Sequence, residues 1–213
     1  MDLSLFEGLS WSALGGFALT SVLIELTPGP NMLTLAVIAA SKGRKLGYAA
    51  VAGVALGLLI MGVAAAVGLG AAVSASPVLY QALRWGGVAY LLWLAYDGWV
   101  DAGQDEDLRA GSDRVWHYFK RGLIINLLNP KAAIFYIAVL PNFIVTDAPI
   151  LMQTVVLSLT YVAVATVVHA TIVTLAGLTQ RLLQDPRRSQ MIRRILALAL
   201  AGVALWFGWQ TGR

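Results

Sequence analysis

The sequence is poor in charged residues and contains no cysteine. Only 12% of its residues are Asp, Glu, Lys or Arg, whereas 59% are hydrophobic. A soluble domain carries about 25% charged residues. The low charge therefore argues against an ordinary soluble domain and predicts an integral membrane protein. The lack of cysteine excludes disulfides and thiolate chemistry, but it does not identify a compartment.

Signals for catalysis and for secretion are also missing. The chain has only two histidines, and neither G-x-S-x-G nor H-E-x-x-H occurs in it. Asp2 and Glu7 precede the first apolar run, without any Lys or Arg, so we expect no cleaved signal peptide. The net charge of +4 comes from basic residues in short loops between apolar runs, which argues against nucleic-acid binding. We predict no enzyme activity, catalytic residue, metal ligand or cofactor.

The apolar runs are continuous rather than alternating, which is typical of membrane-spanning helices and not of a barrel. We predict an all-α integral membrane protein with six transmembrane helices in a single domain, 1–213. A polar connector at 101–116 separates two three-helix repeats, 1–100 and 117–213. The predicted helices are 11–40, 48–73, 78–97, 117–140, 150–178 and 195–209, with a basic loop at 41–45.

The first and fourth of these helices are interrupted by proline. Pro28-Gly-Pro-Asn31 breaks the first, and Asn129-Pro-Lys131 breaks the fourth. Proline removes a backbone donor, and glycine adopts dihedral angles that other residues avoid. One proline is commonly a simple kink in a membrane helix, but paired breaks in two halves point to a transporter site. Three crossings per half give the second half an inverted topology.

The residues at the breaks suit a zwitterionic ligand. Asn129 is a good helix N-cap and Pro130 a good first helical residue, and Gly29 with Pro30 can begin a helix in the first half. The free amides of such helix starts suit a carboxylate. The carbonyls left at the preceding helix end, with the carboxylate of Glu25, suit an ammonium. These groups together predict an amino acid as the ligand.

Glu25 and Lys131 are costly in hydrocarbon unless they are paired, wet or neutralised. They can form a structural ion pair with each other, or Glu25 can bind substrate and protons. Thr154, Ser158, Tyr161 and His169 fall on one face of the predicted helix 150–178. His169 can carry protons near neutral pH, although a lone buried histidine is more often a packing residue. Glu25 and His169 are therefore our proton-coupling candidates.

Basic residues near helix ends predict the orientation. Twelve lie in the loops after the first, third and fifth predicted helices or at the start of the fourth, and only Arg213 lies on the opposite side. The positive-inside rule then places those three loops in the cytoplasm and both termini outside.

Two motifs carry a resemblance to a known family. Glu25-Leu-Thr-Pro-Gly-Pro-Asn-Met32 and Gly122-Leu-Ile-Ile-Asn-Leu-Leu-Asn-Pro-Lys131, with the Gly43-Arg44 turn and a glycine-rich second helix, resemble the LysE/RhtB amino-acid exporters. The resemblance covers nearly the whole chain. It implies secondary transport of amino acids or close derivatives out of the cytoplasm, driven by protons or other ions, across a bacterial inner membrane. The substrate-binding candidates are Glu25, Thr27, Pro28, Gly29, Pro30, Asn31, Asn126, Asn129, Pro130 and Lys131.

Two other functions stay open from the sequence. A membrane-embedded enzyme would need a nucleophile and base, and none is evident. An exporter of inorganic cations would need several carboxylates, histidines or cysteines within the helices. The sequence does not identify the amino acid or the coupling ion, and it leaves open whether the chain forms a homo-oligomer.

Overall fold

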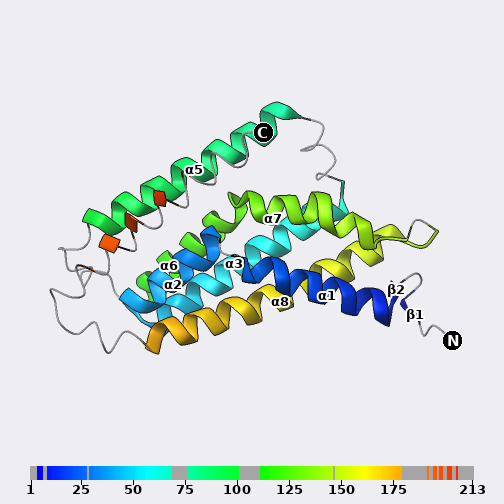
Figure 1. Cartoon of the computed structure of the whole chain (residues 1–213), viewed down its shortest axis with the longest axis horizontal. Coiled ribbons are helices and arrows are strands. Elements are labelled where there is room, and N and C mark those ends of the chain that lie inside the picture. The colour runs from blue at the N-terminus through cyan, green and yellow to red at the C-terminus, as the bar shows by residue number, and fades with distance from the viewer. Residues whose placement is uncertain are drawn as a thin grey trace.

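The computed structural model shows a bundle of long helices that run roughly along one axis, with α5 lying along one side (Figure 1). It describes residues 4–6, 9–27, 29–68, 76–100, 111–145 and 147–178, and the separate positions 191, 194, 195, 197, 198, 201, 202 and 205. Most of the predicted sixth helix and residues 101–110 of the connector lie outside this description.

The first half begins with a short antiparallel hairpin, β1 (Ser4–Phe6) and β2 (Leu9–Ser10), which the sequence did not predict. Three helices follow: α1 (Trp11–Leu26), α2 (Pro30–Lys42) and α3 (Arg44–Ala66). α5 (Pro77–Val100) completes the described part of this half. The predicted break is present, because α1 and α2 meet at 62°.

The second half repeats the interruption. α6 (Gly111–Leu127) is followed by α7 (Pro130–Ile134), a π-helical segment η3 (Phe135–Val139) and a 3-10 segment η4 (Leu140–Phe143). The two parts of this broken helix meet at 52°. α8 (Ile150–Leu178) has the bounds that the sequence predicts.

Several predicted boundaries are wrong, among them the end of the second helix, because α3 ends at Ala66 and not at residue 73. Residues 41–45 do not form a loop, because Gly43 alone separates α2 from α3; its φ of 93° is one that glycine adopts easily. Residues 111–116 belong to α6 and not to the connector. Asp113 lies in the first turn of α6, where a carboxylate interacts favourably with the helix dipole.

Glycines bring α3 and α6 into backbone contact. A Cβ atom on Gly53 would collide with the carbonyl oxygen of Phe119, and one on Gly122 would collide with that of Ala50. Gly53 and Gly122 therefore have a packing role, since small residues let membrane helices approach closely. α3 also packs on α8, and α8 packs on α1 and α2.

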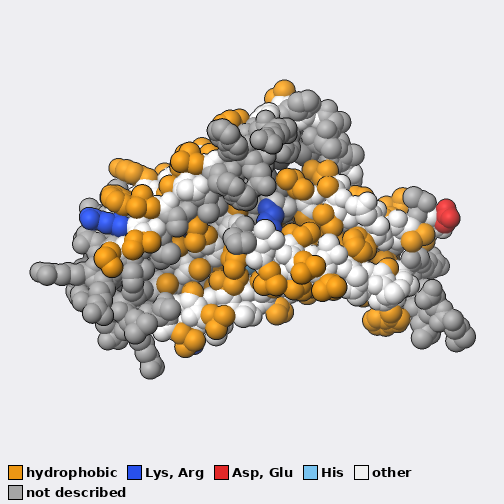
Figure 2. Space-filling view, viewed as in Figure 1, with side chains coloured by type: hydrophobic (Ala, Val, Ile, Leu, Met, Phe, Trp, Pro, Cys, Tyr) orange, Lys and Arg blue, Asp and Glu red, His pale blue; other side chains and the backbone are white. Residues whose placement is uncertain are grey.

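The described helices are apolar enough for a membrane. α3 and α8 can each cross a bilayer by length and hydropathy, and each bent pair can count as one further span. The described residues therefore contain two to four candidate crossings. Hydrophobic side chains cover much of the face in Figure 2, and the coloured charged groups lie near its ends and at one point near its middle.

Candidate functional site

The first break leaves a helix end and a helix start close together. Thr27 is the C-cap of α1, and its amide donates to the carbonyl oxygen of Ile24. Gly29 is the N-cap of α2, with Pro30 at the first helical position, as predicted. No side chain caps α2, so the amides of Asn31 and Met32 lack partners within the helix. Pro28 lies outside the described residues.

The second break is capped by its own asparagine. Asn129 Oδ1 accepts a hydrogen bond of 3.0 Å from the amide of Lys131, and Pro130 occupies the first helical position of α7. The predicted N-cap is therefore confirmed. This cap leaves the start of α7 less open to a ligand than the start of α2.

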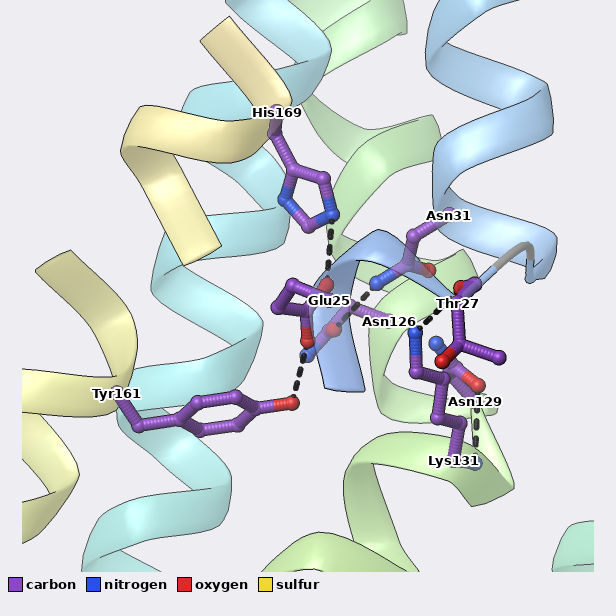
Figure 3. Close-up of polar contacts among 8 residues, drawn as sticks. All are labelled: Glu25, Thr27, Asn31, Asn126, Asn129, Lys131, Tyr161 and His169. Carbon is purple, nitrogen blue, oxygen red and sulfur yellow. Dashed lines mark hydrogen bonds and ion pairs between the residues drawn. The ribbon is translucent and has the colours of Figure 1, made fainter. Parts of the chain in front are cut away.

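Glu25 lies in the protein interior between two side chains of α8. Tyr161 donates a hydrogen bond of 2.6 Å to Glu25 Oε1, and His169 Nε2 lies 3.2 Å from Glu25 Oε2 (Figure 3). Glu25 is 6% exposed and His169 is 1% exposed. The structure thus brings the two proton-coupling candidates of the sequence into direct contact.

The ring of Tyr161 is fixed by aromatic packing. It stacks on Phe135 with ring centroids 3.7 Å apart, and Tyr136 meets it edge-on. Tyr136 in turn donates a hydrogen bond of 2.8 Å to the carbonyl oxygen of Leu58 on α3. Aromatic residues of the second half therefore fix the position of the Tyr161 hydroxyl, from which Glu25 accepts its hydrogen bond.

Lys131 reaches from the second break to the first. Its ammonium donates a hydrogen bond of 2.9 Å to the backbone carbonyl oxygen of Thr27 (Figure 3). Its arm passes Gly29, where a Cβ atom would lie 3.4 Å from Lys131 Cδ. The direct Glu25–Lys131 ion pair considered from the sequence does not form. The carboxylate has Tyr161 and His169 as partners instead.

A pair of asparagines provides a second bridge between the breaks. Asn31 Nδ2 donates a hydrogen bond of 2.8 Å to Asn126 Oδ1, and both side chains are buried. Gly57 leaves the space for Asn126, because a Cβ atom there would lie 2.8 Å from Asn126 Nδ2. The candidate residues from both motifs therefore meet in one region, which Figure 3 shows.

The face of α8 that carries Thr154, Ser158, Tyr161 and His169 is buried, as its helical spacing predicts. Sequence reasoning missed Tyr136 and Thr34 in this region. Thr34 follows Asn31 by one helical turn, which was the available signal. Among the described residues, Thr34 Oγ1, Asn31 Oδ1 and His169 Nδ1 are buried and have no hydrogen-bond partner.

This arrangement offers groups for binding and for proton transfer. Carbonyl oxygens and the Glu25 carboxylate suit an ammonium, and the free amides at the start of α2 suit an anionic group. His169 and Glu25 can share a proton across their contact. No cluster of three or more His, Cys, Asp or Glu that could hold a metal occurs within the described residues.

Comparison with known proteins identifies the class. The profile of the LysE type translocators matches residues 22–211, so the chain belongs to the LysE family of membrane translocators. Together with its apolar spans, this makes the chain a multi-pass membrane protein. No solved structure matches the chain.

Curated relatives are efflux proteins. A homoserine/homoserine lactone efflux protein of Salmonella typhi is 32% identical over 84% of this chain and 87% of its own length. The protein of that name from Salmonella typhimurium is 33% identical over the same shares. A leucine efflux protein of Salmonella choleraesuis is 35% identical over 65% of each chain.

Proposed function

We propose that this chain is a secondary transporter that exports amino acids or close derivatives from the cytoplasm and couples export to a proton gradient. Family membership and the names of its relatives support an efflux function. The relatives' substrates are homoserine, its lactone and leucine by name, so they support an amino-acid substrate without selecting one.

One observation carries the proposal. Side chains of the second break reach the first break at two places, from Lys131 to Thr27 and from Asn126 to Asn31. Broken membrane helices leave polar backbone groups that are tolerated only where protein or a wet cavity surrounds them. Two such breaks that share polar contacts form the type of site at which transporters bind substrate.

The substrate is recognised at both of its charged groups. Its ammonium binds near the end of α1, where the carbonyls and Glu25 are negative. Its carboxylate binds at the uncapped start of α2, at the amides of Asn31 and Met32. The substrate-binding residues are those named from the two motifs, with Thr34 as an addition from the structure.

Glu25 and His169 carry the coupling proton. A proton on Glu25 neutralises the carboxylate and weakens its attraction for the substrate ammonium, so proton and substrate compete. The hydrogen bond from Tyr161 keeps the carboxyl group of Glu25 in one orientation in both its protonated and its ionised state. Competition for one group is a simple way to link proton entry to amino-acid exit.

The topology that we propose has six crossings as two inverted three-helix repeats, with both termini outside the cytoplasm of a bacterial inner membrane. The packing of the described helices supports it: α3 of the first half packs on α6 of the second, and α8 of the second half packs on α1 of the first. The second helix of each half, α3 or α8, thus packs on the broken helix of the other half, an arrangement that agrees with two-fold related repeats.

The test is efflux from proteoliposomes loaded with labelled amino acids, screened across all twenty and homoserine. An imposed proton gradient should accelerate efflux of at least one of them. Glu25→Gln keeps the shape but cannot titrate, so it should abolish the acceleration while the protein still inserts and folds. Asp113→Asn, an exposed carboxylate on α6, is the matched control and should transport normally.

Three results would contradict the proposal. Efflux of inorganic cations without any amino acid would favour a cation exporter. Chemical conversion of a loaded amino acid would favour a membrane-embedded enzyme. Normal gradient-driven efflux by Glu25→Gln, with an unchanged pH profile, would make Glu25 structural and leave His169 as the coupling candidate.

A further inference from the structure

The end of α1 contacts a cationic side chain, Lys131. The last carbonyl oxygens of a helix lack amide partners, and they form the negative end of the helix dipole. At the end of α1, the amide of Thr27 binds the carbonyl of Ile24 and the hydroxyl of Thr27 binds that of Leu23. The carbonyl of Thr27 itself points to the ammonium of Lys131 at 2.9 Å.

The positive charge of Lys131 is unfavourable at the start of its own helix, α7. It lies in the first turn of α7, where the helix dipole is positive and a cation is disfavoured. Its arm leaves that end and takes the ammonium to the negative end of α1, in the other half of the chain. The arm passes close to Gly29, where a Cβ atom would be in van der Waals contact with it, and Lys131 is only partly buried. Among the described residues, the ammonium has one hydrogen-bond partner, the backbone oxygen of Thr27, and it remains within reach of a ligand.

We propose that the end of α1 is a binding site for primary ammonium groups, that Lys131 fills it when the transporter is empty, and that the substrate ammonium displaces Lys131. This inference rests on the proposed function for the identity of the displacing group. A primary ammonium supplies three N–H donors to carbonyl oxygens, as the lysine does. Between transport cycles, Lys131 keeps the carbonyl oxygen of Thr27 hydrogen-bonded, and it competes with the substrate ammonium for that oxygen.

Chemical replacement of the lysine tests the site without any transport. Lys131→Ala removes the arm and leaves the carbonyl of Thr27 without its donor. n-Propylammonium has the three carbons and the head group that Lys131→Ala removes, so millimolar concentrations should raise the thermal unfolding temperature of purified Lys131→Ala. Wild-type protein and Lys120→Ala, which removes an exposed lysine of α6, should shift much less.

Tetramethylammonium and sodium control for general salt effects, because neither has an N–H donor. An equal shift of all three proteins by n-propylammonium would overturn the proposal, as would no shift of Lys131→Ala. These outcomes do not depend on amino-acid export, so they separate this inference from the proposed function.

The displacement step has its own readout. If Lys131 competes with the substrate, Lys131→Met should bind the amino acid found in the efflux screen several-fold more tightly than wild-type protein does. If Lys131 instead binds the substrate carboxylate, the variant should bind several-fold more weakly, and the displacement would be refuted.

Amine labelling of the wild-type chain covers the case in which the variants fail to fold. A displaced Lys131 should react faster with an amine-specific reagent when the amino acid is present, as measured by mass spectrometry of the peptide that contains it. Lys120 serves as the internal reference for reagent activity. Slower or unchanged labelling of Lys131 would overturn the displacement.

Discussion

The hydrogen bond between Tyr161 and Glu25 should differ in strength between the two charge states of the carboxylate. Its length of 2.6 Å falls in the range of O–H···O⁻ bonds, which are shorter than bonds between neutral groups. A hydrogen bond to a charged group contributes about 1.5–3 kcal/mol, whereas one between neutral groups contributes about 0.5–1.5 kcal/mol. The two charge states of Glu25 therefore predict different coupling energies with Tyr161.

A double-mutant cycle of Tyr161→Phe and Glu25→Gln isolates that difference. Phenylalanine keeps the ring that stacks on Phe135, and glutamine keeps an acceptor oxygen of similar position. With Glu25 ionised, the coupling free energy should be roughly 1–1.5 kcal/mol, the difference between charged and neutral hydrogen bonds. With Glu25 protonated, it should be close to zero.

Reversible unfolding in mixed detergent and SDS micelles, followed by the fluorescence of the seven tryptophans, measures the four free energies of unfolding. The coupling should be present at pH 8 and should disappear as the pH falls and Glu25 takes up a proton, because the stronger bond belongs to the ionised form. Transport coupling through Glu25 requires this titration to occur in the folded protein.

Tyr136→Phe provides the control. Its hydroxyl donates to a backbone carbonyl of α3 at 2.8 Å and not to Glu25. Because Tyr136 reaches Glu25 only through its packing on Tyr161, its coupling with Glu25→Gln should be weaker than that of Tyr161 and stay below about 0.5 kcal/mol. A Tyr161–Glu25 coupling below that limit at pH 8, or one that does not change with pH, would refute the reasoning.

Two further predictions concern packing and topology. Gly53→Ala should lower the free energy of unfolding by about 1–3 kcal/mol, because its methyl group meets the backbone of α6. Gly15→Ala is the control and should leave the free energy of unfolding unchanged, because a Cβ atom there has no neighbour within 4 Å. Equal losses in the two variants would contradict the packing argument. Reporter fusions at Gly103 and Gln184 should read cytoplasmic and a fusion at the C-terminus periplasmic; a cytoplasmic C-terminus would rule out the inverted repeat.

The breaks were predictable from the sequence because their causes are local. Proline lacks an amide proton wherever it occurs, and Asn129 before Pro130 is a capping signal that needs no distant partner. The bounds of α8 followed from a single uninterrupted apolar run. The start of α3 could not be predicted in this way, because the hydropathy of the basic residues 41–45 indicates a loop. In the structure, Gly43 alone turns the chain between α2 and α3.

The pairing of Glu25 could not be read from the sequence, because Tyr161 lies 136 residues away and its register depends on helix packing. Sequence reasoning offered Lys131 as the partner, since a full charge attracts an opposite charge. In the structure, the ammonium of Lys131 instead donates a hydrogen bond to the backbone carbonyl oxygen of Thr27 at the end of α1, which carries no full charge. The partners of Glu25 are therefore side chains that carry exchangeable protons, whereas the partner of Lys131 is a backbone carbonyl, which carries none.

If Glu25 and Lys131 were paired directly, each proton uptake by Glu25 would leave an isolated cation beside it, in surroundings where charge is costly. In the proposed mechanism, Glu25 can therefore change its charge while Lys131 keeps its hydrogen bond to Thr27, and the substrate ammonium competes with the proton for Glu25 and with Lys131 for the end of α1.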